Sequence, residues 1–170
     1  MPIVNTAPTM KKIAVILAAL ALCGAALEAS ANVVRPAPDF LFKVADGRSS
    51  SLKSLRGQPV VMLVAPSHRS GAFRKQTKYL EEIYRKFAER DVVFVAVFTE
   101  GVERAQSDIP FVYPVDPVGL AAELGIGGEF ATIVIGEDGN MDLVTSKVSA
   151  AGYIEAVINN AYPVQQRQRQ

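Results

Sequence analysis

Residues 60–98 read VVMLVAPSHRSGAFRKQTKYLEEIYRKFAERDVVFVAVF, and their pattern gives the strongest indication of the fold class. Its two ends, 60–64 and 92–98, are continuous apolar runs rich in β-branched residues, a pattern typical of strands buried on both faces. Between them, apolar residues recur at helical spacing from about 70 to 89, with charged residues on the other side. A strand, a helix and a second strand in this order predict a βαβ unit with parallel strands.

The sequence around this unit predicts further elements of the same sheet. Downstream we expect a helix that Asp116-Pro117 begins, two strands joined by an Asp138-Gly139 turn, and a last helix capped by Ser149. Upstream we expect a short strand and one helical turn. The predicted ranges are 40–44, 51–57, 117–124, 131–135, 141–145 and 150–161. This order is that of the thioredoxin fold, so we predict a three-layer α/β/α domain with a central mixed sheet and an N-terminal extension.

The first 31 residues have a different character from the rest. Met10-Lys11-Lys12 is a short positive segment, Ile13–Leu27 carries no charge, and Ala29-Ser30-Ala31 is a small-residue triplet. This order predicts a secretory signal peptide over 1–31, cleaved after Ala31, and a start at Met10 gives it a compact length. The apolar run is short for a transmembrane helix. The protein is therefore expected to be exported, periplasmic or secreted, with no transmembrane segment once the leader is removed.

The chain has one cysteine, Cys23, and it lies in this leader. A minor alternative is a lipid anchor on Cys23, but the bulky Leu22 precedes it where lipoprotein signals have a small residue. After the leader, 32–170 has a formal charge of zero and no cysteine. We expect the domain to span 32–164, followed by a disordered polar tail, 165–170.

The charge pattern and the residue counts exclude several kinds of site. No basic stripe with interleaved aromatic residues is present, so we expect no nucleic-acid partner. His68 is the single histidine of the chain. A metal site normally needs several imidazole or thiolate ligands, and 32–170 has one histidine and no cysteine, so we predict no metal. We also predict no cofactor and no catalytic residue.

Three segments near the N-terminus resemble the opening of the redoxin family, which joins thiol peroxidases and thiol–disulfide reductases. They are Pro36-Ala37-Pro38-Asp39-Phe40, then Asp46-Gly47, then Ser51–Gly57 with its L-x-x-L-x-G pattern. The resemblance runs from about Pro36 to Ala161. It implies a thioredoxin-like fold and a reactive cysteine at the start of the long helix, where the helix dipole lowers the pKa of a thiol.

Both halves of the redox site that the resemblance implies are missing. Alignment on Leu80–Tyr84 places Ser70 at the first cysteine of a C-x-x-C pair and Phe73 at the second. Phe130 stands where the family has a cis-proline, and we expect a trans bond there because a cis bond before another residue costs about 2.5–4 kcal/mol. Phe73 and Phe130 either fill the old redox groove or form an apolar patch for a partner.

One polar cluster lies at the same place. Its members are basic or hydroxyl-bearing and surround the start of the long helix: Ser67, His68, Arg69, Ser70 and Arg74. Free N–H groups and a partial positive charge at a helix start favour an anion. The cluster is thus a candidate site for a small anion or an envelope protein, and the alternative is a solvated, capped loop.

These observations favour an exported thioredoxin-like domain without thiol redox activity, acting as a binding or chaperone-type module of the cell envelope. The first alternative is an oxidoreductase of the thiol peroxidase or disulfide reductase type, as the family resemblance alone implies. The second is a structural envelope protein without a ligand. The missing cysteine argues against an enzyme.

Overall fold

The structure is a computed structural model that describes residues 35–44, 47–87, 91–101 and 104–160. The predicted leader 1–31, with Cys23, and the predicted tail 165–170 lie outside these ranges. Among the helices within them, none is long and apolar enough to cross a membrane.

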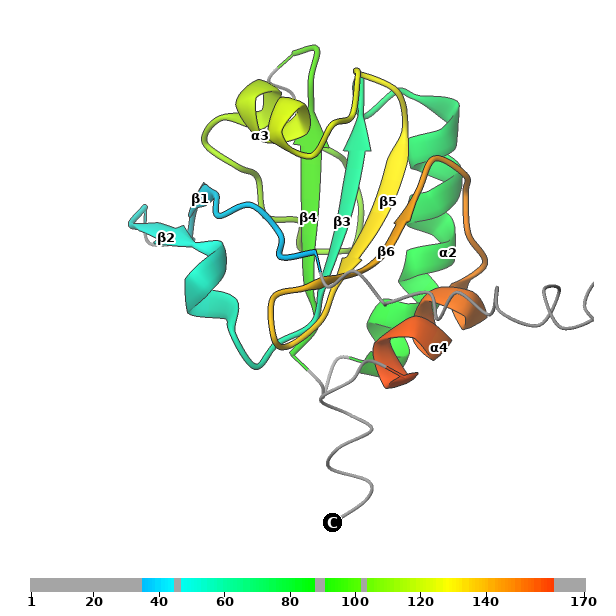
Figure 1. The fold of residues 1–170 in the computed structure, drawn as a ribbon. Coiled ribbons are helices and arrows are strands. Elements are labelled where there is room, and N and C mark those ends of the chain that lie inside the picture. The colour runs from blue at the N-terminus through cyan, green and yellow to red at the C-terminus, as the bar shows by residue number, and fades with distance from the viewer. Residues whose placement is uncertain (1–34, 45–46, 88–90, 102–103, 161–170) are drawn as a thin grey trace, which may run out of the picture. The chain divides into compact units, whose positions relative to one another are not determined.

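The central sheet has four strands: β3 (Val60–Ala65), β4 (Val93–Phe98), β5 (Ala131–Ile135) and β6 (Met141–Thr145). Their order across the sheet is β4-β3-β5-β6 (Figure 1). β3 pairs parallel with β4 and antiparallel with β5, and β5 pairs antiparallel with β6. The predicted βαβ unit, the hairpin and the mixed sheet are confirmed.

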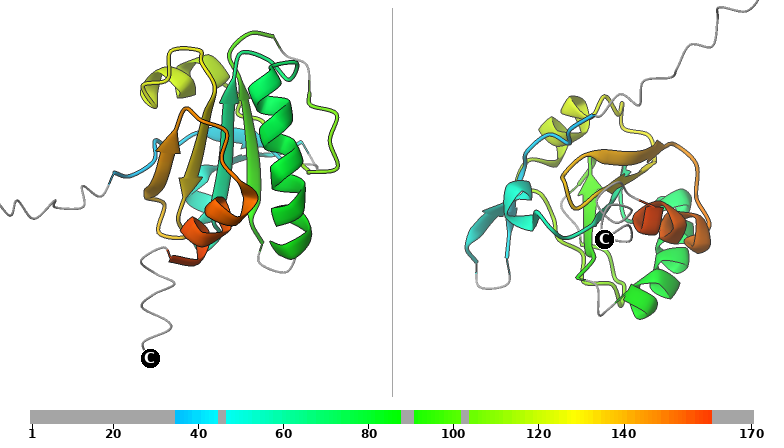
Figure 2. Two further views of the ribbon diagram at one scale, coloured as in Figure 1. Left: turned by 90° about the vertical axis from the view of Figure 1, so that its right-hand side faces the viewer. Right: turned by 60° about the horizontal axis from the view of Figure 1, so that its bottom comes forward.

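Helices cover both faces of this sheet. Helices α2 (Gly71–Phe87) and α4 (Ala151–Asn160) lie on one face, and α3 (Pro117–Glu123) lies on the other (Figure 2). All six residues of β3 are buried. Alternate residues of β3 belong to two different apolar clusters, because successive side chains of a strand point to opposite faces. Val61 and Leu63 cluster with residues of α2 and α4, whereas Val60, Met62 and Val64 cluster with residues of α3.

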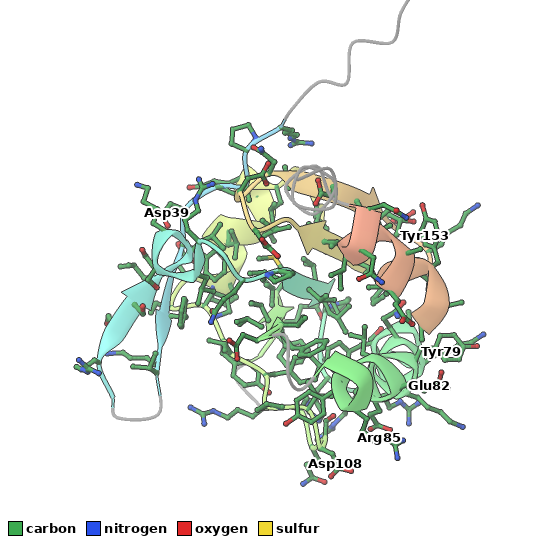
Figure 3. All side chains as sticks on the ribbon, turned by 90° about the horizontal axis from the view of Figure 1, so that it is seen from below. Asp39, Tyr79, Glu82, Arg85, Asp108 and Tyr153 are labelled. Carbon is green, nitrogen blue, oxygen red and sulfur yellow. The ribbon has the colours of Figure 1, made fainter. Side chains whose placement is uncertain are left out.

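The N-terminal extension forms a small hairpin beside the sheet. Strands β1 (Leu41–Lys43) and β2 (Ser49–Ser51) pair antiparallel, and a short 3-10 helix, η1 (Leu52–Leu55), follows. β2 was not predicted, since three serines carry no apolar alternation. Asp39, labelled in Figure 3, accepts the Lys53 backbone N–H at 3.3 Å and contacts its ammonium at 3.0 Å. Asp39 of the proline-rich opening thus fastens the start of the domain to η1.

Residues 111–115 run along the outer edge of β4, although the sequence predicts irregular structure there. The Val112 N–H donates to Phe94 at 2.8 Å, and the Ala96 N–H donates to the Val112 carbonyl at 3.0 Å. On the other side, the Val115 N–H donates to the Leu41 carbonyl at 2.7 Å. The segment therefore links β4 to β1, through backbone bonds that leave no side-chain pattern in the sequence.

The start of α4 differs by one residue from the prediction. The Ala150 carbonyl accepts the N–H groups of Tyr153 and Ile154, so Ala150 rather than Ser149 begins the helical bonding. The Ser149 hydroxyl instead lies 3.5 Å from the Lys147 carbonyl. The start of α3 agrees with the prediction, since the Asp116 side chain accepts the Gly119 N–H at 2.9 Å.

Candidate functional site

The loop that carries the candidate residues leaves the sheet where β3 and β4 both end. The Thr99 N–H, just after β4, donates to the Ala65 carbonyl at 3.1 Å, and the Glu100 N–H donates to Pro66 at 2.8 Å. These two bonds tie the ends of the parallel strands together. The loop 66–70 is therefore anchored at its first residue before it turns into α2.

Ser67 to Ser70 form a tight turn. The Ser67 hydroxyl oxygen accepts the Arg69 N–H at 3.3 Å, and the Ser67 carbonyl accepts the Ser70 N–H at 3.1 Å. The Ser70 carbonyl then accepts the Arg74 N–H at 3.0 Å, which is the first helical bond of α2. Ser70 thus occupies the cap position of the helix backbone, and Ser67 stabilises the turn before it.

The structure brings the five predicted residues together at this end of the sheet. The side chains of Arg69 and Arg74 are exposed, and Ser67, His68 and Ser70 are half-buried. The His68 ring meets Phe98 of β4 edge-on, with 6.2 Å between ring centres. Two exposed guanidinium groups and one half-buried imidazole therefore lie around the start of α2.

Phe73 lies in the core under this surface. Its side chain is 2% exposed, and its ring packs against Phe98 at 5.0 Å and against Phe111 at 5.8 Å between centres. A residue at this position is therefore closed off from solvent by aromatic neighbours. The position that the resemblance assigns to the second cysteine serves packing in this chain.

Phe130 closes the same end of the core from the β5 side. Ala131 pairs with Val64, so Phe130 lies beside the end of β3 from which the 66–70 loop departs. Its side chain is 9% exposed and belongs to the same buried cluster as Phe73. No peptide bond in the described ranges is cis, so the bond before Phe130 is trans, as expected. The two rings fill this part of the core and do not form the exposed patch of the alternative reading.

Gln76 of α2 is a buried polar residue whose role the sequence analysis missed. Its amide oxygen accepts the Ser149 N–H at 2.7 Å and lies 3.4 Å from the Thr132 hydroxyl, while its amide nitrogen donates to the Ser149 carbonyl at 3.0 Å. Gln76 therefore ties α2 to β5 and to the segment before α4. The signal in the sequence is a polar residue at an inward position of an amphipathic helix.

A pair of carboxylates lies at the opposite end of β5: Asp138 in the turn to β6, and Asp142 in β6 itself. Asp138 accepts the Asn140 N–H at 3.0 Å. Burial, together with the nearby Asp138 charge, raises the pKa of Asp142 to about 6. The pair is remote from the 67–74 surface and serves the hairpin turn. Throughout the described ranges, no three His, Cys, Asp or Glu side chains gather as a metal site requires.

The outer face of α2 carries charges that take no part in this site. Figure 3 shows Glu82 and Arg85 pointing away from the sheet, and both side chains are exposed. Glu82 and Arg85 therefore belong to a solvated helix face.

Comparison with known proteins gives one family and many structures of the same fold. The model of the AhpC/TSA family matches residues 33–144. No curated protein matches the chain. A thiol:disulfide interchange protein from Bacteroides sp. is 19% identical, with a TM-score of 0.61, over 81% of this chain and 97% of its own. Peroxidoxin BcpB from Mycobacterium tuberculosis is 21% identical, with a TM-score of 0.58, over 75% of this chain and 96% of its own. At these identities the likeness shows the thioredoxin-like fold.

Proposed function

The chain belongs to the AhpC/TSA family, and we propose that it is a member without thiol redox activity that acts as an exported binding or chaperone-type module of the cell envelope. The observation that supports this proposal is that neither position compared with a redox cysteine holds a thiol. Ser70 begins the helix where the resemblance places the reactive cysteine, and Phe73 is buried in the core where it places the second.

A serine at this position does not replace the thiolate. A serine hydroxyl ionises too weakly at neutral pH to attack as a cysteine does, and it forms no reducible bond with a second residue. The sequence from 32 onward holds no cysteine. The chemistry of a thiol peroxidase or disulfide reductase, the first alternative, therefore has no group to carry it within this domain.

The remaining choice lies between a binding module and a structural envelope protein. Two exposed arginines beside a helix start that is fixed by loop bonds favour the binding module, because this surface presents positive charge to a small anion or to an acidic segment of an envelope protein. Export itself is inferred from the leader-like 1–31 segment, whose cleavage after Ala31 removes Cys23. A lipid anchor on Cys23 would likewise leave the domain without a free thiol.

We expect the purified protein to show no disulfide-reductase and no peroxidase activity. Insulin reduction and peroxide consumption should stay at the rate of a buffer control while an authentic thioredoxin is active in parallel. Ser70→Cys should not restore reductase activity, because Phe73 and Phe130 also differ from the redox pattern.

Where the full chain is purified with its leader retained, a Cys23→Ser variant is the matched control for this assay. Activity that rises with protein concentration and disappears in Cys23→Ser would contradict the proposal, since the leader cysteine would then be the reactive group. Activity that persists in Cys23→Ser identifies a contaminating redoxin, and a further purification step should remove it.

We expect weak binding of inorganic phosphate at the 67–74 surface. Charge-assisted hydrogen bonds are worth about 1.5–3 kcal/mol at best, and exposure and salt lower this value. In a phosphate titration, the backbone amide shifts of residues 67–74 should move most. Arg69→Ala should weaken these shifts.

Arg85→Ala, which removes an exposed cation from the outer face of α2, is the control and should leave the titration unchanged. The proposal would be contradicted if the largest amide shifts fell outside residues 67–74, or if Arg69→Ala titrated as the unmodified protein does. The cluster would then be only a solvated loop that caps the helix.

A further inference from the structure

A cavity of about 950 Å³ lies on the β4 side of the sheet, separate from the 67–74 surface. Its walls come from the second half of β4, the end of β1 and the segment 110–117 that links these two strands. Sites for organic molecules occupy about 300–1,000 Å³. The cavity is therefore large enough for a small organic ligand.

Three aromatic rings form one wall: Phe98, Phe111 and Tyr113. Phe98 and Tyr113 pack with their ring centres 6.1 Å apart. Phe73 lies behind this wall and contacts both Phe98 and Phe111, at 5.0 and 5.8 Å between centres. Phe73, at the position that the resemblance assigns to the second cysteine, thus packs against two of the three rings of this wall.

The polar groups of the cavity favour an anion. Arg104 holds its guanidinium carbon 5.5 Å from the centre of the Tyr113 ring. The Tyr113 hydroxyl oxygen accepts the Ala105 N–H at 2.9 Å, so its own proton is available for a further acceptor. Among the described residues that line the cavity, the charged ones are Arg104 and Lys43, and both are cations.

We propose that this cavity binds an organic anion that carries one carboxylate on a flat apolar body. The rings of Phe98, Phe111 and Tyr113 contact the apolar body, and Arg104 together with the Tyr113 hydroxyl holds the carboxylate. Lys43, at the β1 side, adds a second positive charge. This site goes beyond the proposed function, which concerns the 67–74 surface. Phe98 lies between the two, because it lines the cavity and also contacts the His68 ring.

The test is a titration of the purified protein with 2-naphthoate, followed by amide shifts. We expect saturable binding, with the largest shifts in residues 96–98 and 104–115. Arg104→Gln should weaken binding by at least about tenfold, and Tyr113→Phe by a smaller factor, because it removes the hydroxyl and keeps the ring. Lys43→Gln should weaken it less than Arg104→Gln. Arg85→Gln removes an exposed cation outside the cavity and should bind as the unmodified protein does.

Neutral 2-naphthalenemethanol is the matched ligand and should bind at least about tenfold more weakly than the acid. Equal affinity for acid and alcohol would overturn the proposal, as would the absence of saturable binding by protein whose amide spectrum is folded. Shifts confined to 67–74 would also overturn it, yet they would support the proposed binding surface, so the two proposals fail separately.

Discussion

Replacing Phe73 by alanine should lower the free energy of unfolding by about 3–5 kcal/mol, as truncation of a buried aromatic side chain does. The side chain is 2% exposed and packs against both Phe98 and Phe111, so its removal leaves a cavity between α2, β4 and the segment 111–115. Urea unfolding followed by circular dichroism measures the effect, since the chain has no tryptophan.

Two further variants calibrate this prediction. Phe73→Leu keeps an apolar side chain and should cost about 1–2 kcal/mol. Tyr79→Ala changes a half-buried side chain of the same helix and should cost less than Phe73→Ala. A loss near zero in Phe73→Ala would contradict the structure, because it would mean that the ring does not fill the core at this position.

The burial of Phe73 is also the reason why we expect a thiol at Ser70 alone to make no redox site. A disulfide reductase resolves its mixed disulfide with a second thiol that reaches the first. Here the second position lies beneath the surface and is held by two rings. Phe73→Cys would remove that packing. A C-x-x-C pair in this chain would therefore lower the stability of the domain, and its second thiol would be poorly placed to reach the first.

Most of the fold could be predicted from the pattern of apolar and polar side chains along the chain. The apolar runs ending at Val64 and Phe98 identify buried strands, because both faces of β3 and β4 are covered by helices. The two positions compared with redox cysteines, Ser70 and Phe73, were assigned by aligning the helical residues Leu80–Tyr84 with the family pattern. Elements without such a pattern were missed: β2 is three serines that pair with β1, and the segment 111–115 bonds to β4 through its backbone.

The 67–74 surface could be predicted from the sequence, whereas the cavity could not. The 67–70 loop is local in sequence, so its residues could be named in advance. The cavity joins Lys43, Phe98, Arg104 and Tyr113 from segments that only the folded chain brings together. The Gln76 contacts join residues 73 positions apart, and the sequence shows only that a polar side chain lies on the inward face of a helix.

Gln76→Leu should lower the free energy of unfolding by about 2–4 kcal/mol, although leucine is apolar and Gln76 is fully buried. The substitution leaves the Ser149 N–H, the Ser149 carbonyl and the Thr132 hydroxyl without their Gln76 partner. A buried polar group without a partner costs about 1–3 kcal/mol, which exceeds what the added apolar contact returns. Thr132→Val removes only the 3.4 Å contact and should cost about 1 kcal/mol or less.

Gln76→Glu distinguishes the contribution of the hydrogen bonds from that of packing, because it keeps the shape of the side chain and replaces only the amide group by a carboxyl group. A protonated carboxyl accepts the Ser149 N–H and donates to the Ser149 carbonyl, as the amide does, whereas the ionised form loses the donor and buries a charge. The folded variant therefore holds its proton more tightly than the unfolded chain. Relative to the unmodified protein, its stability should be nearly equal at pH 4 and should fall as the pH rises from about 4.3 toward neutrality. Urea unfolding at pH 4 and pH 7 measures this difference. A deficit that is the same at both pH values would mean that the side chain contributes volume alone, and that the bonds from Gln76 to Ser149 do not stabilise the domain.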